Sequence, residues 1–255
     1  MVWKKGEMTL MKLRFLNTNA LKILAAALML VDHIGVLFFP QVLAWRIVGR
    51  LSFPLFAFAL SEGCRYTRDK VKHFLLVFVL AVVCQTVYYF FDNGSLYMCI
   101  LVTFSLSILT IYAMQFFKKT LFDGSPLYKQ ILSGALFIAT VIGVYLLCET
   151  VTIDYGFWGC MLPVFASIFD FHRIPAPEEL KKLDSLLLRV LCLGVGLGML
   201  AISYAPVTLP VYAFPAILIL LLYNGKKGKT KLKYFFYLFY PLHLALLEGV
   251  YLLIA

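Results

Sequence analysis

The chain has 255 residues, of which 62% are hydrophobic and only 14% are charged. Soluble domains carry about 25% charged residues, so this composition excludes a soluble globular enzyme and a disordered chain. The net charge of +10 is interpreted as Lys and Arg of cytoplasmic loops in a membrane protein rather than as a nucleic-acid surface.

A helix that spans a membrane needs about 20 mainly apolar residues. The sequence predicts nine such helices, at 20–39, 43–63, 72–91, 96–117, 128–148, 152–170, 185–204, 206–223 and 234–254. Long continuous apolar runs favour helices over a membrane barrel, whose strands would be short and alternating. We therefore predict an all-α polytopic membrane protein in which residues 1–255 form a single transmembrane domain.

The Lys and Arg residues outside these stretches gather in alternate loops. They are Lys4, Lys5, Lys12 and Arg14; Arg65, Arg68, Lys70 and Lys72; Lys118, Lys119 and Lys129; Arg173, Lys181 and Lys182; and Lys226, Lys227, Lys229, Lys231 and Lys233. The loops near 40–42, 92–95, 149–151 and 204–206 contain none. By the positive-inside rule, this alternation predicts a cytoplasmic N-terminus and an outer C-terminus.

Two histidines lie deep within predicted spans. His33 follows Lys22 by eleven positions, which is about 16 Å and close to three helical turns. Lys22 is thus placed at the cytoplasmic end, with His33 near the midplane on the same face. His243 lies at a similar depth on the last span. Polar groups at this depth are costly and usually functional, although each histidine is also compatible with a hydrogen-bonded packing role.

Arginines on the second span suggest an anion site. Arg46 and Arg50 are four positions apart and share one helix face. They suit an anionic group or an oxygen that develops negative charge. The alternative is an ion pair with Asp32, Asp154 or Glu248, and both interpretations can hold. Arg189, by contrast, lies within a turn of the membrane edge, and we expect it to extend its charge to the surface.

The cytoplasmic end of the second span carries Arg65 and Arg68, one turn apart. This pair can bind a phosphate, or it is a simple charge cluster in a loop. The six cysteines are scattered singly and include no Cys-x-x-Cys motif. They are interpreted as small hydrophobic residues rather than as a disulfide framework. Sequence motifs of a zinc site are absent, and we expect no metal.

Several motifs resemble the TraX family of membrane proteins. They are Ala20-Leu21-Lys22, Asp32-His33-Ile34-Gly35, the stretch from Arg46 to Phe58, Asp154-Tyr155-Gly156 with Gly159, and Tyr240-Pro241-Leu242-His243. The resemblance covers nearly the whole chain, in the right order. TraX proteins are polytopic, and the best known is linked to N-terminal acetylation of conjugative pilin. The chain departs from the pattern at Tyr97-Met98-Cys99, where an asparagine is expected, and at Gln85, where an acidic residue is expected.

A wider resemblance is to the acyltransferase-3 group of transmembrane acetyltransferases. Lys22 and His33 match that group's hallmark of a basic residue, ten residues and a histidine. Arg65-Tyr66-Thr67-Arg68 is similar to its Arg-x-x-Arg motif. These enzymes take acetyl from cytoplasmic acetyl-CoA and transfer it to an acceptor at or beyond the membrane.

The resemblance implies a transmembrane acetyltransferase of the bacterial cytoplasmic membrane, with one acyltransferase-like domain. It implies His33 as general base or, as the alternative, as the residue that carries the acetyl group itself. It implies Asp32 as the support of His33 through a neighbouring helix, and Arg50 or His243 as the oxyanion donor. Lys22, Arg65 and Arg68 would bind the phosphates of acetyl-CoA, while Arg46, Asp154 and Tyr155 would contact the acceptor. The acceptor is left open as a peptide amine, a glycan hydroxyl or a lipid-linked sugar.

Two other functions use the same residues. A proton-coupled transporter would use the buried Asp, His and Arg side chains as a relay, although no internal repeat is visible. A membrane scaffold for surface assembly would perform no chemistry. Binding of acetyl-CoA distinguishes these functions from the acetyltransferase, because only the acetyltransferase should be thermally stabilised by acetyl-CoA.

Overall fold

The computed structural model describes residues 14–91, 96–228, 230 and 232–254. Within this part of the chain the secondary structure is helical, and the only β-type pairings are two isolated bridges, Leu16–Tyr223 and Met98–Ile153. The prediction of an all-α fold is confirmed. Five of the predicted topogenic lysines, at 4, 5, 12, 229 and 231, lie outside the described residues.

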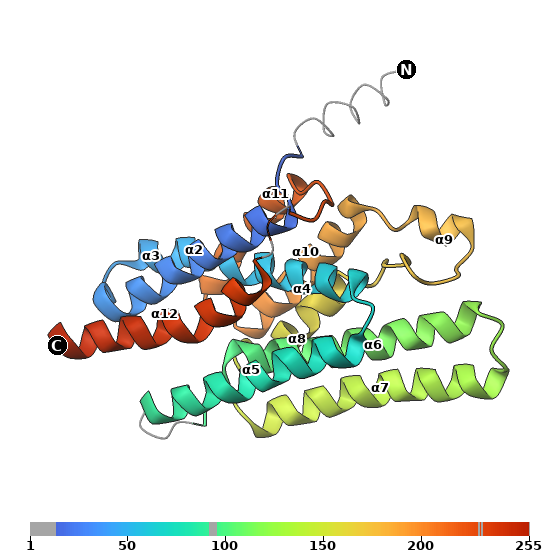
Figure 1. Ribbon diagram of the computed structural model, residues 1–255, viewed down its shortest axis with the longest axis horizontal. Coiled ribbons are helices and arrows are strands. Elements are labelled where there is room, and N and C mark those ends of the chain that lie inside the picture. Colours follow the sequence, from blue (N-terminus) through green and yellow to red (C-terminus); the bar gives the residue numbers. More distant parts are fainter. Residues whose placement is uncertain (1–13, 92–95, 229, 231, 255) are drawn as a thin grey trace, which may run out of the picture. The chain divides into compact units, whose positions relative to one another are not determined.

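The helices are labelled in Figure 1. In chain order they are α2 (Thr18–Phe38), α3 (Leu43–Gly49), α4 (Ser52–Tyr66), α5 (Lys70–Phe91), α6 (Ile100–Phe122), α7 (Leu127–Thr150), α8 (Gly156–Phe165), α9 (Glu178–Lys182), α10 (Leu186–Ser203), the 3-10 helix η1 (Leu209–Ala213), α11 (Ala216–Leu221) and α12 (Lys233–Ile254).

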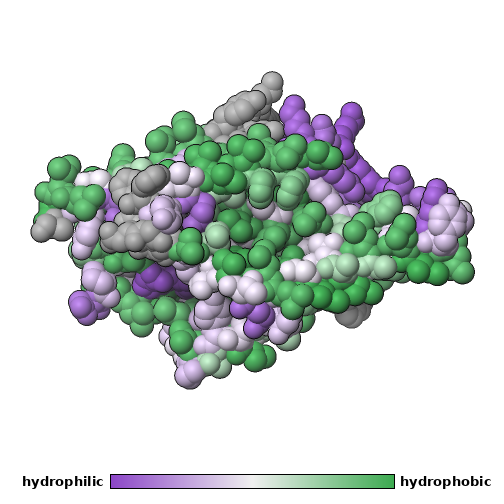
Figure 2. Space-filling model, turned by 90° about the horizontal axis from the view of Figure 1, so that it is seen from below, coloured by the Kyte–Doolittle hydropathy of each residue, from purple (hydrophilic) through white to green (hydrophobic). Residues whose placement is uncertain are grey.

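Six helices or helix pairs among the described residues are long and apolar enough to cross a membrane. They are Thr18–Phe38, Leu43–Tyr66, Lys70–Tyr89, Ile100–Phe122, Leu127–Thr150 and Leu186–Ser203. Hydrophobic side chains cover most of the face drawn in Figure 2, as the hydrocarbon of a bilayer requires. The protein is therefore an integral membrane protein, as predicted.

Of the other three predicted spans, one is shortened, one is divided, and the last forms a single helix. The stretch 152–170 holds α8, whose 10 residues rise about 15 Å, half the hydrocarbon thickness of a bilayer. The stretch 206–223 is divided between η1 and α11, because Pro210 and Pro215 cannot donate backbone hydrogen bonds. In the last stretch, Leu238–Ile254 is the apolar part of α12. The count of nine spans and the orientation of the termini therefore stay predictions.

The chain divides into two compact units. Unit 1 comprises Met1–Ala59 and Pro206–Ala255, and unit 2 comprises Leu60–Ala205. In unit 1, α2 packs against α3 and α12, and α3 contacts η1. In unit 2, α6 packs against α5, α7 and α8, and α8 packs against α10 (Figure 1). Helix α4 begins in unit 1 and ends in unit 2.

The first described helix of unit 1, α2, begins at an asparagine cap. The Asn17 side chain accepts hydrogen bonds from the backbone of Asn19 and Ala20, both at 3.0 Å. This satisfies two amide groups that lack partners within the helix. The residue before it, Leu16, pairs with the backbone of Leu222. The N-terminal end of α2 is thus joined to the segment that follows α11.

Two glycines let α2 and α3 approach closely. A Cβ atom built on Gly49 would lie 2.3 Å from the Cβ of Asp32, and one built on Gly35 would lie 2.3 Å from the Cβ of Trp45. Both distances are far below van der Waals contact, so neither position accepts a side chain. Small residues at helix interfaces serve this purpose in membrane proteins.

This contact predicts the effect of enlarging Gly49. Gly49→Ala should lower the free energy of unfolding by about 1–3 kcal/mol, because the methyl group overlaps Asp32. Gly143→Ala on α7 is the matched control, since nothing lies within 4 Å of its added Cβ. The control should be neutral or slightly stabilising. Thermal unfolding in detergent measures both variants, and equal midpoints would contradict the close packing.

Candidate functional site

Two imidazoles meet in unit 1, between α2 and α12. The ring centroids of His33 and His243 are 5.1 Å apart, in an edge-to-face arrangement. The two rings therefore lie at one level of unit 1, and their depth in the membrane stays a prediction. His33 Nδ1 lies 2.8 Å from the carbonyl oxygen of Met29, and His243 Nδ1 lies 2.9 Å from that of Phe239. A carbonyl oxygen only accepts, so each Nδ1 carries the hydrogen and each neutral ring keeps its lone pair on Nε2.

The lone pair on His243 is enclosed by protein. His243 is only 6% exposed, and its Nε2 has no hydrogen-bond partner among the described residues. Its ring is stacked on Phe239, with centroids 4.9 Å apart. A buried acceptor without a partner is costly, and such groups are found where a protein keeps a reactive atom ready.

Asp32 forms an ion pair with both predicted arginines. Its Oδ2 accepts from Arg50 Nη2 at 2.8 Å, and its Oδ1 lies 3.4 Å from Arg46 Nε. The two arginines therefore point to one region, as their spacing predicts, and the ion-pair alternative is confirmed for Asp32. Asp32 is thus engaged by arginine rather than by the neighbouring His33. The Ser52 hydroxyl, at the start of α4, also donates to the Ala25 carbonyl oxygen of α2 at 2.7 Å.

Lys22 faces the same helix as His33. Its Nζ lies 5.8 Å from the ring centroid of Phe236 on α12, which is a cation–π contact. Lys22 and His33 therefore project toward one neighbouring helix, as the eleven-residue spacing predicts. The residues predicted to bind coenzyme are divided, since Lys22 belongs to unit 1 while Arg65 and Arg68 belong to unit 2.

A basic cavity lies at one end of unit 2. Its volume is about 210 Å³, and cationic side chains from three separate segments line it. The sequence predicts a phosphate site at Arg65 and Arg68, whereas Lys70, Lys119 and Arg173 are predicted only as charges of cytoplasmic loops. Such a concentration of positive charge around a concave surface suits a phosphate-bearing ligand. The lining residues are Cys64, Arg65, Thr67, Arg68, Lys70, Gln115, Lys119, Asp170, Arg173 and Ile174.

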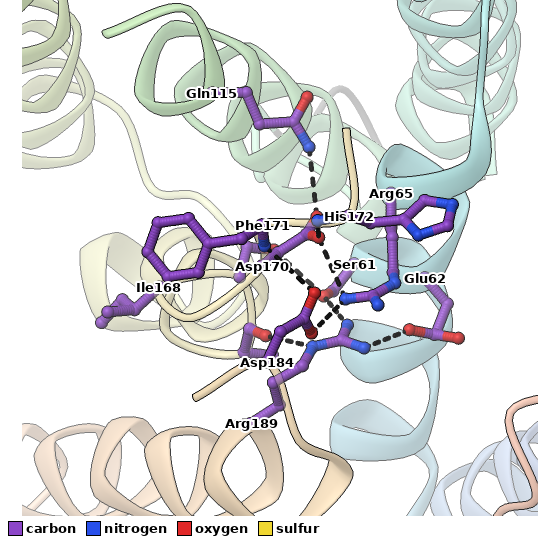
Figure 3. Close-up of polar contacts among 12 residues, drawn as sticks. Ser61, Glu62, Arg65, Gln115, Ile168, Asp170, Phe171, His172, Asp184 and Arg189 are labelled. Atoms are coloured by element: carbon purple, nitrogen blue, oxygen red, sulfur yellow. Dashed lines mark hydrogen bonds and ion pairs between the residues drawn. The ribbon is translucent and has the colours of Figure 1, made fainter. Parts of the chain in front are cut away.

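Arg65 is held by two carboxylates at the edge of this cavity. Figure 3 shows its guanidinium pointing toward Asp170 and Asp184, with which it forms ion pairs. Asp184 Oδ2 also accepts from the backbone amide of Phe171 at 3.2 Å. Much of the charge on Arg65 is therefore offset within the protein. This leaves Arg68, Lys70, Lys119 and Arg173 as the residues that give the cavity its positive charge.

Arg189 does not extend to the membrane surface, so that prediction is wrong. It is 5% exposed and forms an ion pair with Glu62, which is 3% exposed (Figure 3). It also donates to the Ser61 hydroxyl at 3.0 Å and to the Ala166 carbonyl oxygen at 3.1 Å. The partner carboxylate and these two acceptors satisfy the guanidinium group within the protein, as a buried charge requires.

Lys118 was expected in a loop but lies on α6. Its Nζ donates to the carbonyl oxygens of Ser167 at 2.9 Å and of Asp170 at 3.4 Å, and also to that of Ile168. These carbonyls follow the C-terminal end of α8, where a cation is favourable. Lys118 therefore stabilises the end of the half-length helix, which otherwise leaves backbone oxygens without partners.

The opposite end of unit 2 contains Asp154 and Tyr155, the predicted acceptor residues. Tyr97 donates its hydroxyl to Asp154 Oδ1 at 2.7 Å. Burial and the nearby Asp154 carboxylate raise the pKa of Tyr97, so the hydroxyl keeps its proton for this bond. Thr103 donates to the Asp154 carbonyl oxygen at 2.7 Å. Asp154 belongs to a different unit from His33 and His243.

The two departures from the TraX pattern lie side by side. Gln85 donates to the Tyr97 carbonyl oxygen at 2.9 Å and accepts from the Cys99 amide at 2.9 Å. An amide side chain does both, whereas a carboxylate only accepts. The glutamine therefore suits the local backbone of this chain, and Tyr97 supplies a bond to Asp154.

Tyr155 adopts a left-handed backbone conformation with φ of 61°. This is uncommon for an aromatic residue and stores strain. A Cβ built on Gly159 would lie 2.3 Å from the Cβ of Tyr155, so Gly159 is required to admit this turn. The motif Asp154-Tyr155-Gly156 with Gly159 thus encodes a sharp, strained start to α8.

The buried ion pair predicts an asymmetric mutational effect. Arg189→Leu should lower the free energy of unfolding by about 3–5 kcal/mol, because it leaves the Glu62 carboxylate buried without its cation. The double variant Glu62→Leu/Arg189→Leu should cost less than Arg189→Leu alone. Lys181→Ala is the control, since its pair with Glu178 is exposed and should change stability by less than about 0.5 kcal/mol. Unfolding in mixed micelles measures the free energy of unfolding of each variant. A double variant less stable than Arg189→Leu would contradict the buried ion pair.

Comparison with known proteins identifies the family. The family model described as TraX protein matches residues 17–251. The chain is also 26% identical over 256 residues to the probable fimbrial assembly protein FimC, serogroup H1, of Dichelobacter nodosus, covering 89% of this chain and 92% of that protein. No solved structure matches significantly. The match to the TraX model spans nearly the whole sequence, and the chain therefore belongs to the TraX family.

Proposed function

We propose that this protein is an acetyl-CoA-dependent transmembrane acetyltransferase of the bacterial cytoplasmic membrane. The observation that carries the proposal is the pair of imidazoles formed by His33 and His243. Each Nδ1 is bound to a backbone carbonyl, so the neutral rings present Nε2 as a base. A base fixed in one tautomer within a membrane protein is suited to general-base catalysis rather than to packing alone.

In the proposed reaction, His33 Nε2 takes a proton from the acceptor amine or hydroxyl. The acceptor atom attacks the carbonyl carbon of the acetyl thioester, and the carbon–sulfur bond then breaks. The departing thiolate recovers the proton from the imidazolium. His243, whose ring contacts His33, is suited to share the proton, and its tautomer makes it a poor oxyanion donor. Of the two expected oxyanion donors, the geometry therefore favours Arg50, which Asp32 orients.

The donor's phosphates are assigned to the basic cavity of unit 2. Arg68, Lys119 and Arg173 line it together with Arg65. Because Asp170 and Asp184 hold Arg65, we assign Arg65 a positioning role at the cavity edge. Lys22 is retained as a further cation for the coenzyme. No step in this scheme needs a metal ion, and the described residues contain no group of three or more His, Cys, Asp or Glu suited to one.

The family supports an acceptor from surface assembly. One relative is named a probable fimbrial assembly protein, so a fimbrial or pilus component is a reasonable acceptor to test. We assign Arg46, Asp154 and Tyr155 to acceptor contact. A peptide amine, a glycan hydroxyl and a lipid-linked sugar are the candidate acceptors.

A proton-coupled transporter draws less support from the structure. A relay needs carboxylates that are open to neighbouring proton donors and acceptors, whereas the Asp32 carboxylate is bound by two arginines and the Glu62 carboxylate by Arg189. The imidazoles do not distinguish the two functions, but turnover of acetyl-CoA does.

The role of His33 is tested by His33→Gln in nanodiscs. Release of the free coenzyme thiol from acetyl-CoA in the presence of acceptor peptides should fall by at least about 100-fold, because the general base is lost. Binding of acetyl-CoA should remain. His172→Ala is the matched control, since this histidine is exposed and does not line the basic cavity. Full turnover by His33→Gln would contradict the proposal.

The donor site is tested by Arg68→Gln and Lys119→Gln. Each should weaken acetyl-CoA binding by about tenfold or more, because a charge-assisted bond to phosphate is lost. Binding by the wild type should also weaken as salt increases. Lys129→Gln is an exposed control outside the cavity. Calorimetric titration measures the affinities, and unchanged values for both cavity variants would place the coenzyme elsewhere.

A further inference from the structure

Two cysteines meet in unit 2 although they are twelve positions apart. Cys148 lies in the last turn of α7, and Cys160 lies in the first half of α8. Each thiol affects the electrostatics of the other, so the two side chains are neighbours. Tyr145 and Phe157, each three residues earlier, also touch, with ring centroids 5.4 Å apart. The two helices are therefore in contact at the level of the two sulfurs.

The two thiols differ in exposure. Cys160 is fully buried, with an exposure of 0%, and its carbonyl oxygen accepts from the Ser107 hydroxyl at 2.7 Å. Cys148 is partly exposed. An approaching reagent therefore reaches Cys148 first, with Cys160 immediately behind it. This is the arrangement of an attacking and a resolving thiol.

The charge pattern predicts the compartment that this end faces. The loop at 149–151, directly after Cys148, contains no Lys or Arg, so the positive-inside rule places it outside the cytoplasm. Cys148 lies two residues from the end of α7, which is about 3 Å of helix. Disulfides form and persist on the outer side of the membrane, whereas the cytoplasm keeps thiols reduced.

We propose that Cys148 and Cys160 form a disulfide in the mature protein. The Cys148 thiolate attacks a disulfide oxidant, forming a mixed disulfide and releasing one oxidant thiolate. The Cys160 thiolate then attacks the Cys148 sulfur and releases the second thiolate. The two cysteines lose two electrons and two protons, and the oxidant's disulfide is reduced to two thiols.

The bond has a structural consequence for the strained turn. It links the end of α7 to α8 across Asp154 and Tyr155, whose backbone turn stores strain. A cross-link restricts the alternatives open to this short segment. The disulfide would thereby hold the outer end of unit 2 in the conformation that presents Asp154.

The test uses the full-length wild-type protein in intact spheroplasts. Oxidised glutathione, which does not cross membranes, is added outside, and free thiols are then blocked with N-ethylmaleimide before lysis. Peptide mass spectrometry should find residues 148 and 160 joined, with a mass about 2 Da below the two reduced peptides, and this species should vanish after reduction. Because the wild type is measured, the outcome does not depend on a variant that folds.

Three variants sharpen the result. Cys148→Ser and Cys160→Ser should each leave the other cysteine alkylated. Cys84→Ala/Cys99→Ala is the matched control, because the Cys99 thiol lies against the Ala81 carbonyl oxygen at 4.0 Å, and this double variant should keep the cross-link. Alkylation of both Cys148 and Cys160 in the oxidant-treated wild type would overturn the proposal. A cross-link of either cysteine to a different partner would overturn it as well.

Discussion

A carboxylate inside a membrane must be neutralised, and Asp32 meets this requirement by binding Arg46 and Arg50. The remaining features of unit 1 depend on that contact. It holds α2 against α3, which in turn requires Gly49 to lack a side chain. It also engages the carboxylate next to His33, so the imidazole faces His243 rather than an acid.

Buried charges are also neutralised by ion pairs in unit 2. Glu62 and Arg189 neutralise each other in the interior, and Asp170 with Asp184 offsets the charge of Arg65. The cations that remain around the cavity come from the loop between α4 and α5, from α5, from α6 and from the segment after α8. Internal pairing thus separates charges that hold the helices together from charges that are suited to an external anion. Only the second group supports the proposed binding of a phosphate-bearing donor.

Helix periodicity predicted the local features of the site. The four-residue spacing of Arg46 and Arg50 placed them on one face, and depth arithmetic placed His33 level with His243. Pairings between distant segments were not predictable in this way. Glu62 and Arg189 are 127 positions apart, and nothing in either local sequence indicates the other. The same limit explains why Arg173 was assigned to topology and not to a cavity.

The apolar pattern of the sequence also did not predict the lengths of the later helices. Hydropathy treats 152–170 as one span, whereas the strained turn at Tyr155 begins α8 late and the helix ends at Phe165. Prolines divide 206–223 in a similar way. The bounds of these helices therefore depend on backbone conformation, which hydropathy alone does not predict.

The central claim is that acetyl crosses the membrane from a donor on the basic face to an acceptor on the other. It is tested most directly with proteoliposomes of one known orientation and radiolabelled acetyl-CoA supplied on a single side. The account predicts labelled acceptor on the side opposite the Arg68 cavity when the donor is given on the cavity side, and no label when the sides are exchanged. Label that stays with the coenzyme, or transfer that is equal from both sides, would contradict it.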